Sequence, residues 1–150
     1  MVGLSRNIFF YKEILLKDNF ETRINLIFIH FSALLIIFKI KKNKFSQQIF
    51  DNIFVNIEYH IRELGYGDIA VNKKMKILNK IFYDILLKID KGENDKFMIN
   101  GNLLTRHLGL ETERNDEILN KITNYFNSFY DYCFELEDNI MLKGQINFKD

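Results

Sequence analysis

Apolar residues recur every three or four positions along most of the chain, which is the spacing of amphipathic helices. Three long runs show this period, over residues 45–64, 71–89 and 118–140. No stretch of four or more residues alternates clearly enough between apolar and polar positions to predict a strand. The pattern therefore predicts an all-α fold, a compact helical bundle that forms a single domain over residues 1–150.

Residues 24–40 are almost wholly apolar and are followed by a cluster of lysines. A helix that crosses a bilayer needs about 20 apolar residues. This run is shorter and contains Asn25, His30 and Ser32. We therefore expect a central helix that is buried on all sides by the rest of the protein.

Glycine and polar residues separate the periodic runs. Gly65 follows Leu64 at the end of the first long run, where a glycine commonly caps a helix. Asp68 is expected just outside the next helix, where its carboxylate accepts hydrogen bonds from free backbone N–H groups. Residues 91–95 and 100–102 predict polar turns, and one short helix fits between residues 102 and 109.

The composition is that of a folded protein without a strong overall charge. The 150 residues are 47% apolar and 27% charged, with a formal net charge of +1 and no proline. Only a local patch could therefore attract nucleic acid or a membrane. Cys133 is the single cysteine, so no intrachain disulfide forms, and we expect a buried, inert thiol. No signal peptide is expected at the start, because charged residues interrupt the early apolar positions.

No residue pattern predicts catalysis, a cofactor or a metal. The Gly65-Tyr66-Gly67 segment lacks the preceding strand and third glycine of a dinucleotide site, and the Gly-Lys-Ser/Thr of a P-loop. The three histidines are far apart and have no metal-ligand spacing. His30 is expected to be a buried, hydrogen-bonded core residue. We therefore expect a binding protein and not an enzyme.

Charged residues are concentrated around the Gly65 break. Arg62, Glu63 and Asp68 could form an internal network that fixes this hinge, or could bind a partner, and the two roles are compatible. Lys73, Lys76 and Lys80 are spaced to share one helical face. Such a row is usually a solvated face, and the alternative is contact with an anionic partner, either ribosomal RNA or an acidic protein.

Residues 61–76 read IRELGYGDIAVNKKMK. This run resembles the LREhGhGDhxVxKxMK signature, with h apolar, of the ubiquinol–cytochrome c chaperone family, whose members assemble the respiratory bc1 complex. The matching residues are Arg62, Glu63, Gly65, Gly67, Asp68, Val71, Lys73 and Met75, with Phe82 and Tyr83 in a later pair. A weaker upstream match consists of Phe20, Arg23 and His30. The resemblance covers about residues 11–90, with Asp84-Ile85 standing where the family usually has Gly-Arg.

The resemblance implies an assembly chaperone that binds newly made cytochrome b and needs no cofactor. It also implies contact with the ribosome near the exit tunnel, a small partner protein, and transient contact with the inner membrane, without DNA binding. The implied setting is the cytoplasm of a bacterium such as an alphaproteobacterium, at the inner membrane. An apolar groove with a charged rim is the expected means of capturing the client.

The residues that we expect to bind partners are Arg62, Glu63, Gly65, Gly67, Asp68, Lys73, Lys76 and Lys80. The residues that we expect to be structural are Arg23, His30, Val71, Met75, Phe82 and Tyr83. A different interpretation is a small peripheral membrane- or RNA-binding module, in which residues 39–44 and the helix that carries Lys73 form one basic surface.

Overall fold

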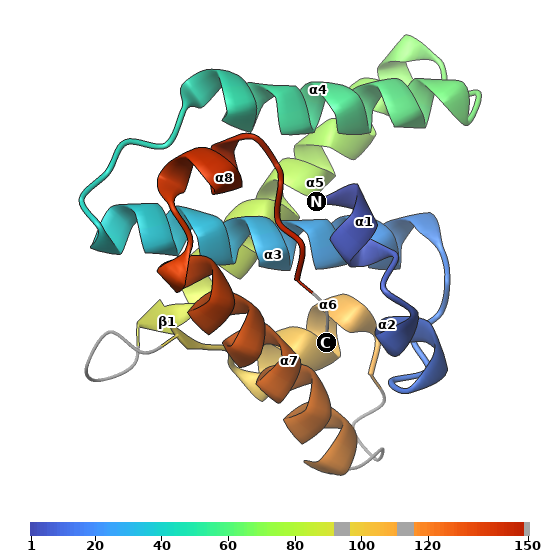
Figure 1. Ribbon diagram of the computed structural model, residues 1–150. Helices are drawn as coiled ribbons and strands as arrows, with labels where there is room; N and C mark the ends of the chain where they lie inside the picture. The colour runs from blue at the N-terminus through green and yellow to red at the C-terminus, as the bar shows by residue number, and fades with distance from the viewer. Residues whose placement is uncertain (92–96, 111–115, 149–150) are drawn as a thin grey trace.

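The computed structural model of the chain describes residues 1–91, 97–110 and 116–148. The predicted all-α fold is confirmed (Figure 1). The helices, in chain order, are α1 (Val2–Ser5), α2 (Ile8–Lys12), α3 (Phe20–Ile40), α4 (Gln47–Glu63), α5 (Asp68–Lys88), α6 (Gly101–Leu108), α7 (Asp116–Glu135) and α8 (Asp138–Leu142).

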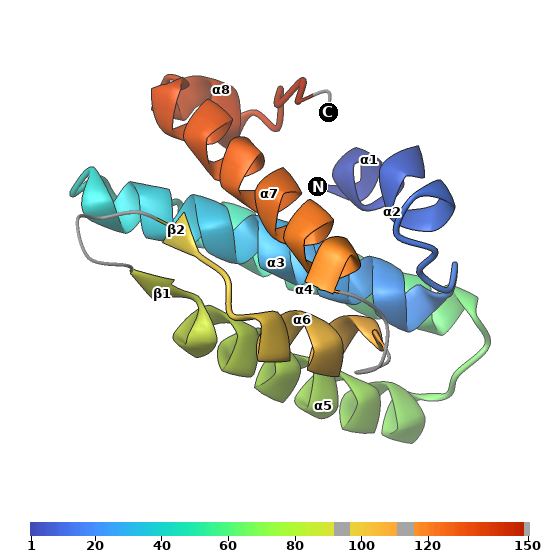
Figure 2. The ribbon, with the colours of Figure 1, turned by 90° about the horizontal axis from the view of Figure 1, so that it is seen from below.

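The central element is α3, which contacts α1, α5, α6 and α7. Figure 2 shows it between α7 on one side and α5 on the other. Every residue from 24 to 34 is buried, as expected for a helix surrounded by protein. Asn19 caps its first turn, because the Asn19 side-chain oxygen accepts a hydrogen bond from the Thr22 N–H at 2.8 Å.

Aromatic rings fill the space on both sides of α3. Between α3, α4 and α5 the rings in mutual contact are Phe28, Phe31, Phe50, Phe54 and Phe82. Between α2, α3 and α7 they are Phe10, His30, Tyr125, Phe126 and Phe129. These two aromatic clusters explain why α3 has no polar face.

A short antiparallel strand pair was not predicted. It joins β1 (Asp90–Lys91) to β2 (Phe97–Met98), with Asp90 opposite Met98. Two-residue strands are too short for an alternating pattern to show. The predicted turn at 91–95 lies, from residue 92 onward, outside the described residues. The second predicted turn is present, because the Asn100 side chain accepts a hydrogen bond from the Asn102 N–H at the start of α6.

The last periodic run, predicted as one helix to residue 140, is divided into α7 and α8. At the break, the Lys41 ammonium donates a hydrogen bond to the Leu136 carbonyl at 3.0 Å and lies 3.8 Å from the Asp138 carboxylate. A lysine distant in the sequence therefore satisfies a carbonyl at the end of α7. A local pattern cannot reveal such a partner.

Candidate functional site

The hinge between α4 and α5 has the backbone geometry that the sequence predicts. Gly65 has φ +90°, and its N–H donates to the Arg62 carbonyl at 2.9 Å. A residue with a side chain rarely adopts this φ, so glycine is required for the cap. Gly67 has φ −74°, which other residues adopt freely.

Arg62 links the two helices of the hinge. Its guanidinium donates to the Glu58 carboxylate within α4, at 2.8 Å from Nη2, and to the Asp68 carboxylate at the start of α5. The hydrogen bonds to Asp68 and then Glu58 raise the pKa of Arg62. The internal network expected at the hinge is thus formed by Arg62 and Asp68, while Glu63 instead lies 3.3 Å from the His60 ring.

The capping role predicted for Asp68 is wrong. Asp68 is the first residue of α5, Gly67 precedes the helix, and no side chain caps the free N–H groups there. The Asp68 carboxylate instead pairs with the Arg62 guanidinium, in an ion pair whose donor and acceptor are both charged.

The three predicted lysines share one exposed face, as their spacing predicts. Lys73, Lys76 and Lys80 are exposed on α5, and none of them forms an ion pair with another described residue. Lys74 lies to one side, with its ammonium 4.4 Å from the centre of the Tyr66 ring.

The other residues of the family-like run divide between core and surface. Val71 and Phe82 are fully buried, and Met75 packs against the core from a half-buried position. Tyr83, next to Phe82, is 52% exposed. The Phe82-Tyr83 pair therefore supplies one core ring and one surface ring. Tyr83 was expected to be structural, but its ring lies on the surface and not in the core.

His30 is buried and hydrogen-bonded at both ring nitrogens, as expected. Its Nδ1 lies 2.7 Å from the Leu26 carbonyl, and its Nε2 lies 3.1 Å from the Tyr125 hydroxyl. Because a carbonyl only accepts, Nδ1 carries the proton and Nε2 accepts from Tyr125. Burial lowers the pKa of His30 to about 3, so the ring is neutral at physiological pH.

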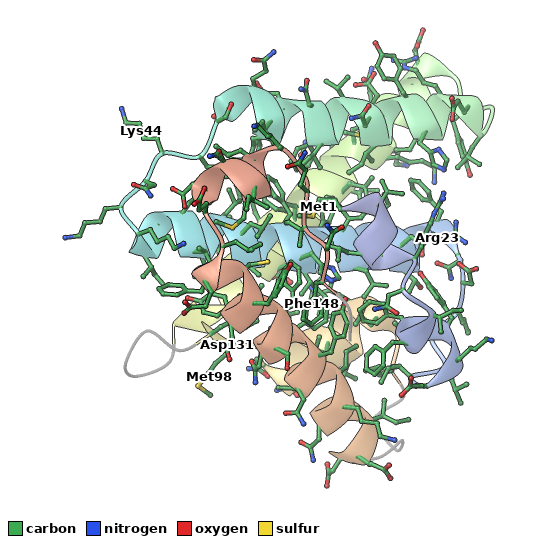
Figure 3. The ribbon with its side chains drawn as sticks, viewed as in Figure 1. Met1, Arg23, Lys44, Met98, Asp131 and Phe148 are labelled. Atoms are coloured by element: carbon green, nitrogen blue, oxygen red, sulfur yellow. The ribbon has the colours of Figure 1, made fainter. Side chains whose placement is uncertain are left out.

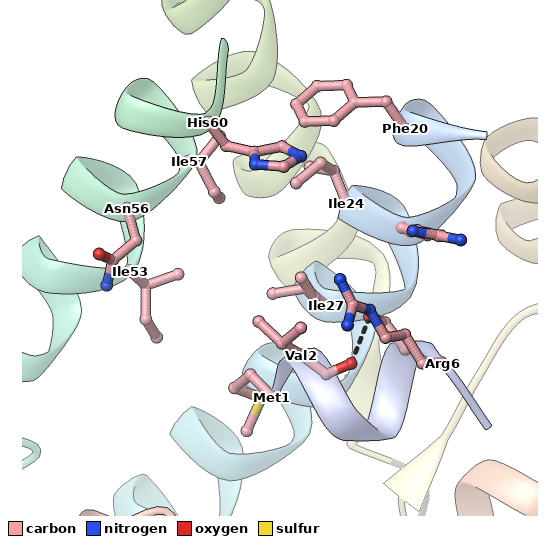
Figure 4. Close-up of a pocket in the computed structure, with 12 residues that line it drawn as sticks. Met1, Val2, Arg6, Phe20, Ile24, Ile27, Ile53, Asn56, Ile57 and His60 are labelled. Carbon is pink, nitrogen blue, oxygen red and sulfur yellow. Dashed lines mark hydrogen bonds between the residues drawn. The ribbon is translucent and has the colours of Figure 1, made fainter. Parts of the chain in front are cut away.

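An open groove lies between α1, the first half of α3 and the second half of α4 (Figure 4). Its volume is about 330 Å³, within the range in which proteins bind ligands. Its walls are mainly aliphatic and come from Met1, Val2, Ile24, Ile27, Ile53 and Ile57. We call this the α1–α3–α4 groove.

Polar and charged residues border the α1–α3–α4 groove. Arg6, Arg23, Asn56 and His60 are among its lining residues. The Phe20 ring stacks on the His60 ring with centroids 5.6 Å apart, while Arg23 is held by Asp18, with Nε 2.7 Å from the carboxylate. The upstream residues Phe20 and Arg23 therefore meet in one site, whereas His30 lies in the core.

The residue pattern did not predict where such a groove would form. The α4 residues that line the groove follow the same helical period as the rest of that helix, so the pattern does not mark them as a site. The helix α1 is too short for a periodic pattern to predict it. The hinge residues around Gly65 do not line the groove. The structure thus separates two candidate sites that the sequence could not distinguish.

The basic segments of the membrane or RNA interpretation are also separated. Figures 1 and 2 place the end of α3 and the start of α5 at opposite ends of the molecule, and Figure 3 shows Lys44 far from Arg23 at the start of α3. Lys41 contacts Leu136 and lies over the Phe134 ring. The two segments therefore do not join into the single basic surface that this interpretation requires.

Among the described residues, no three histidine, cysteine or acidic side chains are grouped so that they could hold a metal ion. An open apolar groove on a helical domain is the kind of surface on which proteins of the peptide-binding class hold apolar segments of other molecules. Within this class, the family model for the ubiquinol-cytochrome C chaperone matches residues 12–148. The chain belongs to this family, and its role is in the assembly of the bc1 complex.

The match to the family extends well beyond residues 11–90, the region over which the sequence resembles the family signature. No curated protein and no solved structure matches the chain. The family therefore rests on the match over 12–148, together with the hinge residues described above.

Proposed function

We propose that the chain binds newly synthesised cytochrome b and holds an apolar segment of it in the α1–α3–α4 groove. The observation that carries this proposal is the groove itself, which has a volume of about 330 Å³, mainly aliphatic walls and an opening to solvent. Apolar surface that is removed from water on binding supplies the affinity. The family supports an assembly role, and an apolar client fits a site with this lining.

The border of the groove gives the site its selectivity. Arg6 presents its guanidinium group beside the aliphatic wall, whereas the guanidinium of Arg23 is already paired with Asp18. Charged groups at the rim of an interface favour partners with complementary charge and disfavour others. We therefore expect the preferred client segment to be apolar with an acidic flank.

The structure supports the hinge as the client site less well than it supports the α1–α3–α4 groove. Its arginine, Arg62, is already bonded to Glu58 and Asp68, so a client would have to displace an internal partner. The partner-binding roles proposed for Glu63, Gly65 and Gly67 stay predictions. So do contact with the ribosome, a small partner protein and action at the cytoplasmic side of the inner membrane.

Site-specific photo-crosslinking tests the groove as the client site. Asn56 lines the groove, and its neighbour Val55 is exposed and does not line it. A photoreactive amino acid at position 56 should give an adduct with cytochrome b in cells, and the same amino acid at position 55 should not. Equal adducts from both positions, or none from position 56, would overturn the placement.

Complementation tests the client and the groove together. Cells without the protein should contain less cytochrome b and less assembled bc1 complex, and the wild-type chain should restore both. Asn56→Glu should restore them poorly, because a client must then cover a carboxylate in the groove. The matched control is Asn52→Glu, an identical change at an exposed α4 position that does not line the groove. Normal cytochrome b in cells without the protein would refute the client.

A further inference from the structure

The side of α5 that points away from the core carries large apolar residues together with the three lysines. The residues on this side are Ile69, Lys73, Lys76, Lys80, Tyr83 and Leu87. They follow each other at intervals of four and three, so they form one straight stripe on the helix. We call this stripe the outer face of α5. It extends over about 27 Å, at about 1.5 Å per residue.

The apolar members of the outer face of α5 are unusually exposed. Ile69 is 88% and Leu87 81% exposed, and Tyr83 is 52% exposed. The core side of the same helix is complete without them, because Val71, Leu78, Phe82 and Ile85 are buried there. Packing within the chain therefore does not explain why these positions are apolar.

The charge of the outer face of α5 is purely positive. Both acidic residues of α5 are engaged elsewhere, Asp68 by Arg62 and Asp84 by Lys88 and His107, with distances of 2.7 and 2.8 Å for the last two. The three lysines have no ion-pair partner among the described residues. Figure 2 shows α5 at the edge of the molecule, with none of the other described helices or strands beyond it.

We propose that the outer face of α5 is a docking surface for an anionic lipid bilayer. The helix lies flat on the membrane, the lysines contact lipid phosphates, and Ile69, Tyr83 and Leu87 enter the boundary between headgroups and acyl chains. The tyrosine suits this depth, because its ring is apolar and its hydroxyl remains hydrated. Binding is reversible, because few apolar side chains enter the bilayer.

A membrane explains this face better than RNA does. Contacts with RNA phosphates require the lysines, and RNA bases stack on aromatic rings such as that of Tyr83, which leaves the exposed aliphatic side chains of Ile69 and Leu87 unexplained. A membrane accounts for both kinds of residue at once. The surface is also separate from the α1–α3–α4 groove, since no residue of the outer face lines that groove. Lipid binding therefore does not depend on the proposed client.

Vesicle flotation measures the proposal with the purified full chain. Vesicles that contain phosphatidylglycerol should bind the protein, and vesicles of phosphatidylcholine alone should not. Each lysine close to an anionic membrane strengthens binding about fivefold, so Lys73→Gln, Lys76→Gln and Lys80→Gln together should weaken it on the order of 100-fold. The matched control changes Lys39, Lys42 and Lys44 to glutamine, which alters net charge equally at exposed positions elsewhere.

Two further variants separate lipid from other anions. Ile69→Ser with Leu87→Ser should weaken vesicle binding severalfold while leaving all lysines in place. Unchanged vesicle binding by this pair, combined with tight binding to single-stranded RNA, would assign the face to RNA. If the two triple lysine variants lost vesicle binding equally, net charge and not the outer face of α5 would explain the binding. Either result, or equal binding to both kinds of vesicle, overturns the proposal.

Tryptophan fluorescence supplies a readout that does not rely on weakened binding. The sequence has no tryptophan, so a single substitution gives an unambiguous signal. The emission of Leu87→Trp should shift to shorter wavelength on phosphatidylglycerol vesicles, because the ring leaves water. Ser128→Trp, at an exposed position of α7 on the other side of α3, should keep its emission wavelength (Figure 2). A shift at position 128 without one at position 87 would place another face on the membrane.

Discussion

A neutral histidine at the centre of the protein makes stability depend on pH. The pKa of His30 is about 3 in the folded chain, because burial disfavours the imidazolium, against about 6.5 when unfolded. Below pH 6.5 the unfolded chain therefore binds the extra proton, and stability falls with falling pH, by up to about 1.4 kcal/mol per pH unit. The loss continues until the pH approaches the folded value.

Urea denaturation at a series of pH values measures this dependence. His30→Gln removes the titration and keeps a polar side chain, so we expect a less stable protein with a shallower decline between pH 6.5 and 4. Acid-side slopes that run parallel in the wild type and the variant would show that His30 does not contribute.

Gly65 is the second residue whose replacement should change the stability of the protein by a measurable amount. Its φ of +90° strains any residue that has a Cβ, although no neighbouring atom lies within 4 Å of the place that a Cβ would occupy. Gly65→Ala should therefore cost about 1–2 kcal/mol through the backbone alone. The control is Gly67→Ala, where φ is negative and the space is equally open. Its cost should come only from alanine being a poorer N-cap than glycine, about 0.5 kcal/mol and below that of Gly65→Ala. Thermal unfolding of Gly65→Ala identical to the wild type contradicts the cap.

Residue positions could be predicted where one local requirement dominates. Gly65 and His30 met expectation, because a positive φ and a polar ring amid apolar neighbours both leave local traces. Asp68 did not, because its partner, Arg62, competed with the backbone for the same carboxylate. Tyr83 shows a further limit, since a matching motif identifies a residue without telling which side of the helix it faces.

At the scale of elements, α3 is long and apolar enough that it could cross a membrane. Among the described residues it is the one helix with sufficient length and hydropathy, and 78% of its most apolar window is buried inside the protein. We expect the protein to be extracted from membranes by alkaline carbonate, which releases peripheral proteins, including one bound through the outer face of α5. Retention of the bulk of the chain in the carbonate-washed membranes contradicts this assignment of α3.

Long helices were predictable and their ends less so. The periodic runs located α4 and α5 because each has one apolar side over many turns. The break between α7 and α8 depends on Lys41, which is distant in sequence. The helices α1 and α2 are short, and their position comes from packing on α3 and α7. The groove that α1 completes was unpredictable for the same reason.

At the scale of the whole molecule, Cys133 reports on global opening. It is fully buried, and burial raises the pKa of its thiol to about 12, so the reactive thiolate is scarce at neutral pH. As the single cysteine, it should react with a maleimide only when the core opens, and the labelling rate should rise with urea in step with unfolding. Rapid, urea-independent labelling in native buffer would show local access to the core between α3 and α7.

The burial of α3 has a consequence for the order in which the chain is made. Phe20–Ile40 leaves the ribosome early, whereas α7, which covers one of its sides, begins at Asp116. At about 5–20 residues per second, the apolar helix waits on the order of several seconds for that cover. During translation the nascent chain therefore presents the same kind of segment as a membrane protein, and competes for the factors that recognise one. Ribosomes stalled after α5 should recruit the membrane-targeting machinery, and ribosomes stalled after α8 emerges should not.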